Sequence, residues 1–170
     1  PEVKIILRGD SGFCRNQLMS WCEGKRVDYV FGLARNKRLR KIIGQQMQKA
    51  TVEWNRTGKP ARVFTEFKYQ TKKTKKRGWD RVVAKAEHID GKENPRFVVT
   101  SLSPEQCTAQ EAYEELYCAR GDMENRIKER FSLFADRVSA ETMRANQLRL
   151  YFSVMAYVLV SGLRRLGLKA

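Results

Sequence analysis

The feature that most constrains the fold is a series of short apolar runs, rich in β-branched residues, that alternate with stretches of helical character. Three such runs occupy residues 3–8, 28–34 and 95–102. Strands that alternate with helices predict an α/β core with a mostly parallel sheet. Two further segments, residues 62–69 and 81–88, alternate apolar and polar side chains, and they predict an antiparallel ribbon.

Composition changes along the chain and indicates an insertion within this core. Residues 1–50 and 93–170 carry the strands and helices of the core, whereas residues 51–92 form a basic, β-rich insertion. The last helical segment, residues 139–168, has an apolar stretch too short to span a bilayer, flanked by Arg149 and Arg164. We therefore predict a buried C-terminal helix that is covered by the sheet, and no membrane partner.

The net charge of the chain indicates the class of partner that it binds. The chain has 34 Lys+Arg against 19 Asp+Glu, a formal net charge of +15. Such a balance predicts a polyanionic partner, of which nucleic acid is the commonest, although a ribosome-associated protein would show the same balance. The four cysteines form no C-x-x-C pair and His88 is the single histidine, which speaks against a zinc site. We expect reduced, mostly buried thiols in a cytoplasmic protein.

The connection between the two ribbon strands is the candidate nucleic-acid contact. It holds five basic residues and a tryptophan, Trp79. Cations can hold a phosphate backbone there while an aromatic ring stacks on a base. A solvated hairpin, with lysines that only aid solubility, explains the pattern equally well. The basic residues are Lys72, Lys73, Lys75, Lys76 and Arg77.

Asp10 directly follows the first apolar run and Gly9. A carboxylate just past the end of a buried strand is commonly a ligand-binding or catalytic group in α/β proteins. The alternative is that Asp10 caps the helix expected over residues 11–23, since aspartate is a good N-cap residue.

A second candidate lies in residues 111–134, which have no proline and predict a helix. Steps of three or four residues would align Tyr117, Arg120, Glu124 and Lys128 in one stripe, with a carboxylate between cations. This pattern is typical of an exposed face with ion pairs. It is also what a metal-ligating carboxylate beside phosphate-binding cations would show.

Asp10 and Glu124 together suggest metal chemistry. Two carboxylates that converge repel one another, and bound Mg²⁺ or Mn²⁺ relieves that repulsion. Metals held in this way can activate water and stabilise the leaving oxygen in phosphodiester cleavage. Such a site usually needs a third carboxylate, which the residues of this chain do not supply.

These motifs resemble the DDE transposases of bacterial insertion sequences, cut-and-paste enzymes with a ribonuclease H-like catalytic core. Residues 8–13 resemble the segment around the second catalytic aspartate of that family, and residues 29–37 the strand and turn that follow. The spacing of Tyr117, Arg120 and Glu124 resembles its tyrosine, arginine and glutamate signature. Residues 134–139 and 145–149 resemble the family's closing region, and the β-rich insertion falls between the second and third acids.

The resemblance implies that Asp10 and Glu124 are catalytic residues and ligate two Mg²⁺ or Mn²⁺ ions, whereas Tyr117, Arg120 and Lys128 bind DNA. It implies an endonuclease that recombines double-stranded DNA, acting on transposon ends and target as a homodimer in the nucleoid. The first catalytic aspartate of the family lies on a strand that would precede Pro1. We therefore expect residues 1–170 to be the C-terminal part of a catalytic domain that binds DNA and alone cleaves poorly.

Two rival functions explain part of the pattern. A non-catalytic, nucleic-acid-binding remnant of a transposase would have the same charge, insertion and aromatic residues. Another ribonuclease H-like enzyme, such as a nuclease or a junction resolvase, would share the acids. Such an enzyme would not be expected to combine the Tyr117, Arg120 and Glu124 helix with a β-rich insertion.

Overall fold

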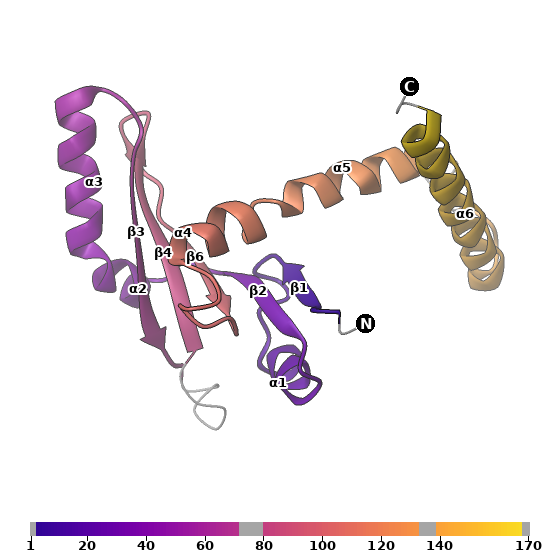
Figure 1. Ribbon diagram of the computed structural model, residues 1–170, viewed down its shortest axis with the longest axis horizontal. Coiled ribbons are helices and arrows are strands. Elements are labelled where there is room, and N and C mark those ends of the chain that lie inside the picture. Colours follow the sequence, from indigo (N-terminus) through magenta and orange to yellow (C-terminus); the bar gives the residue numbers. More distant parts are fainter. Residues whose placement is uncertain (1–2, 72–79, 133–138, 168–170) are drawn as a thin grey trace. The chain divides into compact units, whose positions relative to one another are not determined.

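A computed structural model describes residues 3–71, 80–132 and 139–167 of the chain. The chain forms two compact units, Pro1–Arg120 and Gly121–Ala170. The first unit contains the described strands, and helices build the second (Figure 1). In chain order the elements are β1 (Ile6–Gly9), α1 (Asn16–Gly24), β2 (Asp28–Leu33), α2 (Lys37–Ile42), α3 (Gly44–Thr57), β3 (Ala61–Tyr69), β4 (Asp80–Ile89), β5 (Lys92–Glu93), β6 (Arg96–Thr100), α4 (Ala109–Glu111), η2 (Ala112–Tyr117), α5 (Arg120–Arg130) and α6 (Met143–Gly167).

The strands form one mixed sheet in the order β1-β2-β6-β4-β3, with β5 paired to β4. Strands β1 and β2 run parallel, and the other described pairs are antiparallel. The α/β class is therefore correct, but the prediction of a mostly parallel sheet is wrong. The chain passes from β4 to β6 through a short connection, and a short connection reverses strand direction, whereas a parallel pair needs a long crossover.

The predicted strands are all present, with small differences at their ends. The basic helical segment expected over residues 35–49 is two helices, α2 and α3, and α3 continues to Thr57. Helix α2 begins where the Asn36 side chain accepts a hydrogen bond of 2.9 Å from the Leu39 amide. The segment expected as an insertion begins within α3, and its strands β3 and β4 continue the sheet of the core.

Hydrophobic clusters cover both faces of the sheet, because successive strand residues point to opposite sides. On β2, Tyr29 and Phe31 join the cluster that α1, α2 and α3 cover, whereas Val30 joins the cluster beneath η2. Residues of β4 and β6 divide between the two faces in the same way. Figure 1 shows α3 alongside β3 and β4. The first unit is therefore a sheet between two helical layers.

The four cysteines are free thiols. Cys22 and Cys107 are buried, one in each hydrophobic cluster, and burial raises the pKa of both thiols. Cys14 is half-buried, and Cys118 is exposed in the turn that follows η2.

The helix predicted over residues 111–134 is not one regular α-helix. A capping box of Thr108 and Glu111 begins it, but residues 112–117 form a π-helix, in which the Cys118 amide donates to the Tyr113 carbonyl at 2.9 Å. A turn at residues 118–119 then precedes α5. Each π turn holds about one residue more than an α turn, so the expected alignment of Tyr117 with the residues of α5 does not follow from α-helical spacing.

Strand β1 differs from the buried strand that its apolar sequence predicts. Among the described strands it pairs only with β2, and it forms one edge of the sheet. Leu7 on β1 is exposed, as are Val3 and Ile5, which precede the strand. A buried apolar run and an apolar edge strand have the same local sequence pattern, and the neighbouring strands decide between them.

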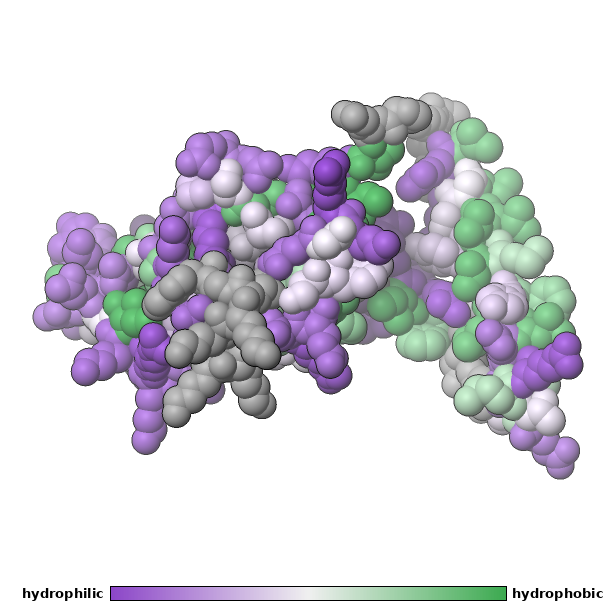
Figure 2. All heavy atoms as spheres, turned by 90° about the horizontal axis from the view of Figure 1, so that it is seen from below, coloured by the Kyte–Doolittle hydropathy of each residue, from purple (hydrophilic) through white to green (hydrophobic). Residues whose placement is uncertain are grey.

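The second unit buries little of its apolar surface. Helix α6 buries Ser153 among its described residues, and large apolar side chains remain exposed along it. Figure 2 shows these hydrophobic residues gathered along α6. The buried C-terminal helix that the sequence predicts is therefore not found within this unit, which has no described strand to cover it. No helix in the described part of the chain is long and apolar enough to cross a membrane.

Candidate active site

Asp10 lies at the end of β1, at the start of a tight turn. Its Oδ1 accepts a hydrogen bond of 2.8 Å from the Gly12 amide, and its carbonyl accepts one of 3.1 Å from the Phe13 amide. Helix α1 begins six residues later, at Asn16, with Arg15 at its N-cap and no side-chain cap. Asp10 therefore does not cap α1, and its exposed carboxylate instead stabilises the turn.

Because Gly32 has no side chain, the Tyr117 hydroxyl can lie close to the backbone that follows β1. A Cβ atom at Gly32 would lie 2.6 Å from the Tyr117 Oη, 3.0 Å from the Ser11 amide nitrogen and 3.3 Å from the Asp10 carbonyl carbon. Any larger residue would displace the hydroxyl or the turn. The structure thus brings Tyr117 next to the Asp10–Ser11 backbone, across a glycine that sequence reasoning did not single out. An isolated glycine in an apolar strand is the signal that could have found it.

Further contacts fix η2 against the sheet. Arg8, on β1, donates a hydrogen bond of 3.2 Å to the Leu116 carbonyl. The Tyr117 ring lies 5.6 Å from the Tyr113 ring, which in turn lies 5.9 Å from Phe64 on β3. Desolvation by burial raises the pKa of Tyr113 to about 12. These contacts hold the end of η2 beside the end of β1.

A buried charge cluster lies under η2. Glu87 on β4 accepts hydrogen bonds from Lys85 and Asn94, both at 2.6 Å, and from Arg62 at 2.7 Å. Arg62 also reaches Glu114 of η2 at 3.3 Å. Burial by itself would raise the pKa of Glu87. The hydrogen bonds to its carboxylate have the larger combined effect, so the pKa lies below its ordinary value. The cluster therefore keeps a charged carboxylate in the interface between sheet and η2.

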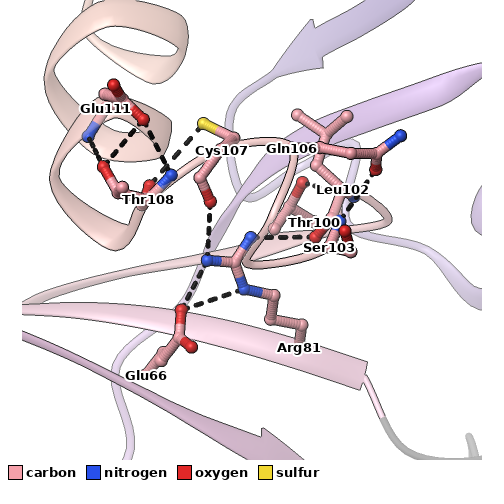
Figure 3. A network of polar contacts seen from close by, with 9 residues as sticks. All are labelled: Glu66, Arg81, Thr100, Leu102, Ser103, Gln106, Cys107, Thr108 and Glu111. Atoms are coloured by element: carbon pink, nitrogen blue, oxygen red, sulfur yellow. Dashed lines mark hydrogen bonds and ion pairs between the residues drawn. The ribbon is translucent and has the colours of Figure 1, made fainter.

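Arg81 holds the connection that leads from β6 into α4 and η2 (Figure 3). Its guanidinium donates to the carbonyls of Leu102 at 2.9 Å and Cys107 at 2.8 Å, and it pairs with Glu66 on β3. Its side chain is 13% exposed. Nothing in the local sequence distinguishes Arg81 from other strand arginines, because its partners are distant in the chain.

The remaining signature residues lie on α5. Arg120 is the first residue of α5, and its side chain is outside the described part of the chain. Glu124 and Lys128 are exposed and one helical turn apart. Both belong to the second unit, whereas Asp10 and Tyr117 belong to the first. The basic residues and the tryptophan predicted to contact DNA also lie outside the described residues: Lys72, Lys73, Lys75, Lys76, Arg77 and Trp79.

The donor chemistry of the predicted acids suits a hard divalent ion. Asp10 and Glu124 are exposed and offer carboxylate oxygens, the ligands that Mg²⁺ and Mn²⁺ prefer. The described residues contain no group of three or more His, Cys, Asp or Glu side chains that could hold a metal ion. Two acids from separate units are thus the candidates, and the described residues of neither unit assemble a complete ligand set.

Comparison with known proteins identifies the family. A family model described as "Transposase DDE domain group 1" matches residues 1–170, the whole sequence. A search of the curated proteins gave no match. The matched segment includes Asp10, Tyr117 and Glu124, the residues on which the sequence resemblance rests. The chain therefore belongs to the transposase DDE domain family.

Proposed function

We propose that this chain is part of the catalytic domain of a transposase that cleaves and rejoins DNA strands in cut-and-paste transposition. The observation that carries the proposal is the placement of the Tyr117 hydroxyl over Gly32, beside the Asp10–Ser11 backbone. A candidate phosphate-binding group and a candidate catalytic carboxylate thereby share one end of the sheet. The parallel β1–β2 pair with a following helix is consistent with a ribonuclease H-like core.

Asp10 and Glu124 would hold two divalent metal ions, Mg²⁺ or Mn²⁺. Bound metal would supply charge stabilisation to the attacking and leaving oxygens of the phosphodiester. Asp10 is suited to this role because the Gly12 amide fixes its carboxylate at the strand end. Tyr117, Arg120 and Lys128 would orient the phosphate next to the scissile bond. A third carboxylate is part of the family pattern, and Asp10 and Glu124 would supply two of the three.

Double-stranded DNA, as transposon end and as target, is the proposed substrate. The net charge of +15 favours a polyanion, and the basic segment with Trp79 lies between the two longest strands of the sheet. The proposed assembly is a homodimer on two DNA ends, in the nucleoid of the cytoplasm. Arg38 stacks on Tyr69 at 5.0 Å where the ribbon approaches that basic segment, which adds a cation near the proposed contact.

The proposal is tested by binding and cleavage assays on the 170-residue chain. We expect a fluorescent DNA duplex to bind with an affinity that falls steeply as salt rises, because counterions are released from phosphates. In Mg²⁺ the chain alone should cleave this duplex poorly, because Asp10 and Glu124 are two of the three carboxylates that the family pattern requires. Absence of DNA binding would contradict the proposal. Efficient cleavage would show that the active site has been assigned to the wrong residues.

A DNA-binding protein without catalysis is the second candidate. The observation that favours it is that no group of three metal-ligating side chains occurs among the described residues. It explains the charge, the basic segment and the ribbon equally well. Metal separates the two candidates, because an enzyme should bind Mn²⁺ through Asp10 and Glu124, and a pure DNA-binding protein should not.

A further inference from the structure

A polar cavity of about 350 Å³ opens where β2 ends and β6 begins. The two strands are antiparallel, with Leu33 opposite Phe97, so the residues that follow β2 lie beside those that begin β6. Tyr117 and Ser11, which belong to the surroundings of the candidate active site, are among the residues that line the cavity. The lining residues are Ser11, Gly32, Leu33, Ala34, Arg35, Pro95, Arg96, Phe97 and Tyr117.

Two arginines give the cavity its charge. Arg35 and Arg96 are both exposed, and no acidic residue is among the lining residues. Within the described part of the chain, neither guanidinium takes part in a hydrogen bond or an ion pair. Other arginines of this unit are engaged, as Arg62 is with Glu87 and Arg81 with Glu66. The guanidinium N–H donors of Arg35 and Arg96 are therefore available to a ligand.

The basic lining favours an oxyanion. The hydroxyl of Tyr117 lies against Gly32 and close to the Ser11 amide, and both residues line the cavity. A guanidinium presents its donors as a planar fork that matches the oxygens of a phosphate. Two such forks with nearby hydroxyl groups suit a phosphodiester better than a metal ion or an apolar ligand.

We propose that this cavity binds a backbone phosphodiester of a DNA strand, with Arg35 and Arg96 as its binding residues. The inference rests on the proposed function and deepens it, since Ser11 directly follows Asp10 and the bound phosphate would lie beside the candidate catalytic carboxylate. Neither arginine belongs to the Tyr117, Arg120 and Glu124 signature. They are positioning residues for the DNA strand.

The test uses the dinucleotide d(TpT), which carries one phosphodiester, and thymidine, which carries none. We expect d(TpT) to shift the backbone amide NMR signals of Ser11 and Gly32, and thymidine to leave them unchanged. The Arg35→Gln/Arg96→Gln variant should lose these shifts and bind a DNA duplex at least tenfold more weakly. Its matched control, Lys49→Gln/Lys59→Gln, removes two exposed charges from residues that do not line the cavity. It should retain the shifts.

The outcomes separate this inference from the proposed function. If the unsubstituted chain binds duplex DNA but d(TpT) leaves Ser11 and Gly32 unshifted, the cavity is not a phosphate site and the proposed function stands. Equal loss of duplex affinity in the arginine variant and the lysine control would also overturn the inference, because it would reflect net charge alone. If the unsubstituted chain binds no DNA, both proposals fall. Circular dichroism of each variant checks that it is folded.

Discussion

The two units hold their candidate site residues in different ways. In the first unit, Tyr117 is fixed by ring contacts, by a glycine beneath its hydroxyl and by a helix that is anchored to the sheet. In the second unit, Glu124 is on an exposed helix, and polar contacts such as Arg164 with Glu129 at 3.3 Å join α5 to α6. Packing therefore defines the surroundings of Asp10 and Tyr117, whereas those of Glu124 depend on little buried surface.

The largest expected effect tests this difference in burial directly. Phe31, on β2, is fully buried in the cluster beneath α1 and α2, and Leu159 on α6 is 67% exposed. We expect Phe31→Ala to lower the free energy of unfolding by about 3–5 kcal/mol, because it leaves a cavity. Leu159→Ala should change it by less than about 0.5 kcal/mol.

Urea unfolding followed by tryptophan fluorescence and by circular dichroism gives both values. All three tryptophans lie within the first unit, so their fluorescence reports on the sheet. A large loss of stability in Leu159→Ala would mean that α6 is packed in solution and that the contrast between the units is wrong.

Next in size is the effect of removing Arg81. Arg81→Met leaves the carbonyls of Leu102 and Cys107 without their donor, and we expect a loss of about 2–3 kcal/mol in the free energy of unfolding. The matched control is Arg56→Met, which breaks an exposed pair with Glu53 on α3 and should leave the free energy of unfolding nearly unchanged. Equal effects of the two changes would show that the Arg81 contacts do not hold the connection into η2.

A smaller effect concerns the contact between Gly32 and Tyr117. Gly32→Ala places a methyl group 2.6 Å from the Tyr117 hydroxyl, and we expect a loss of about 1–3 kcal/mol from overpacking. Tyr117→Phe removes that hydroxyl, so Gly32→Ala should cost less in a Tyr117→Phe background. A double-mutant cycle on unfolding free energies measures the difference. Additive effects would mean that the hydroxyl does not lie over Gly32.

The smallest perturbation is chemical labelling of the four thiols. Cys118, exposed just before the second unit begins, should react first with a thiol reagent. Cys22 and Cys107 should react last, because they are buried and burial raises their pKa values and so lowers the reactive thiolate fraction. Mass spectrometry of partially labelled protein gives the order. Early reaction of Cys22 or Cys107 would indicate that the first unit opens more readily than its packing implies.

The sequence predicted those parts of the fold that depend on local pattern. The β-branched runs predicted the strands, and the sequence order predicted that Asp10 ends the first of them. The prediction of a mostly parallel sheet was wrong because strand direction depends on the turn between β4 and β6 and on pairing with distant residues. The exposure of β1 and of α6 could not be inferred, since an apolar run carries the same pattern whether or not another element covers it.

The site was predicted through family resemblance rather than through geometry. Asp10 was singled out by its position after an apolar run, and Tyr117 and Glu124 by their spacing, but the π-helix that carries Tyr117 leaves no simple periodic signal. Gly32 was recognisable only as a glycine interrupting a strand. Arg35 and Arg96 are distant in sequence and meet only because β2 and β6 are neighbours in the sheet.

The most direct test of the central claim is Mn²⁺ binding, measured by electron paramagnetic resonance in the presence of duplex DNA. We predict that Asp10→Asn and Glu124→Gln each weaken Mn²⁺ binding at least tenfold while the duplex stays bound. Two controls each remove one exposed carboxylate. Asp90→Asn changes a turn residue with φ of 51°, where asparagine is well tolerated, and Glu129→Gln changes α5 itself. Both controls should bind Mn²⁺ like the unsubstituted chain. If either Asp10→Asn or Glu124→Gln does so as well, that carboxylate is no metal ligand and the account of the site is contradicted.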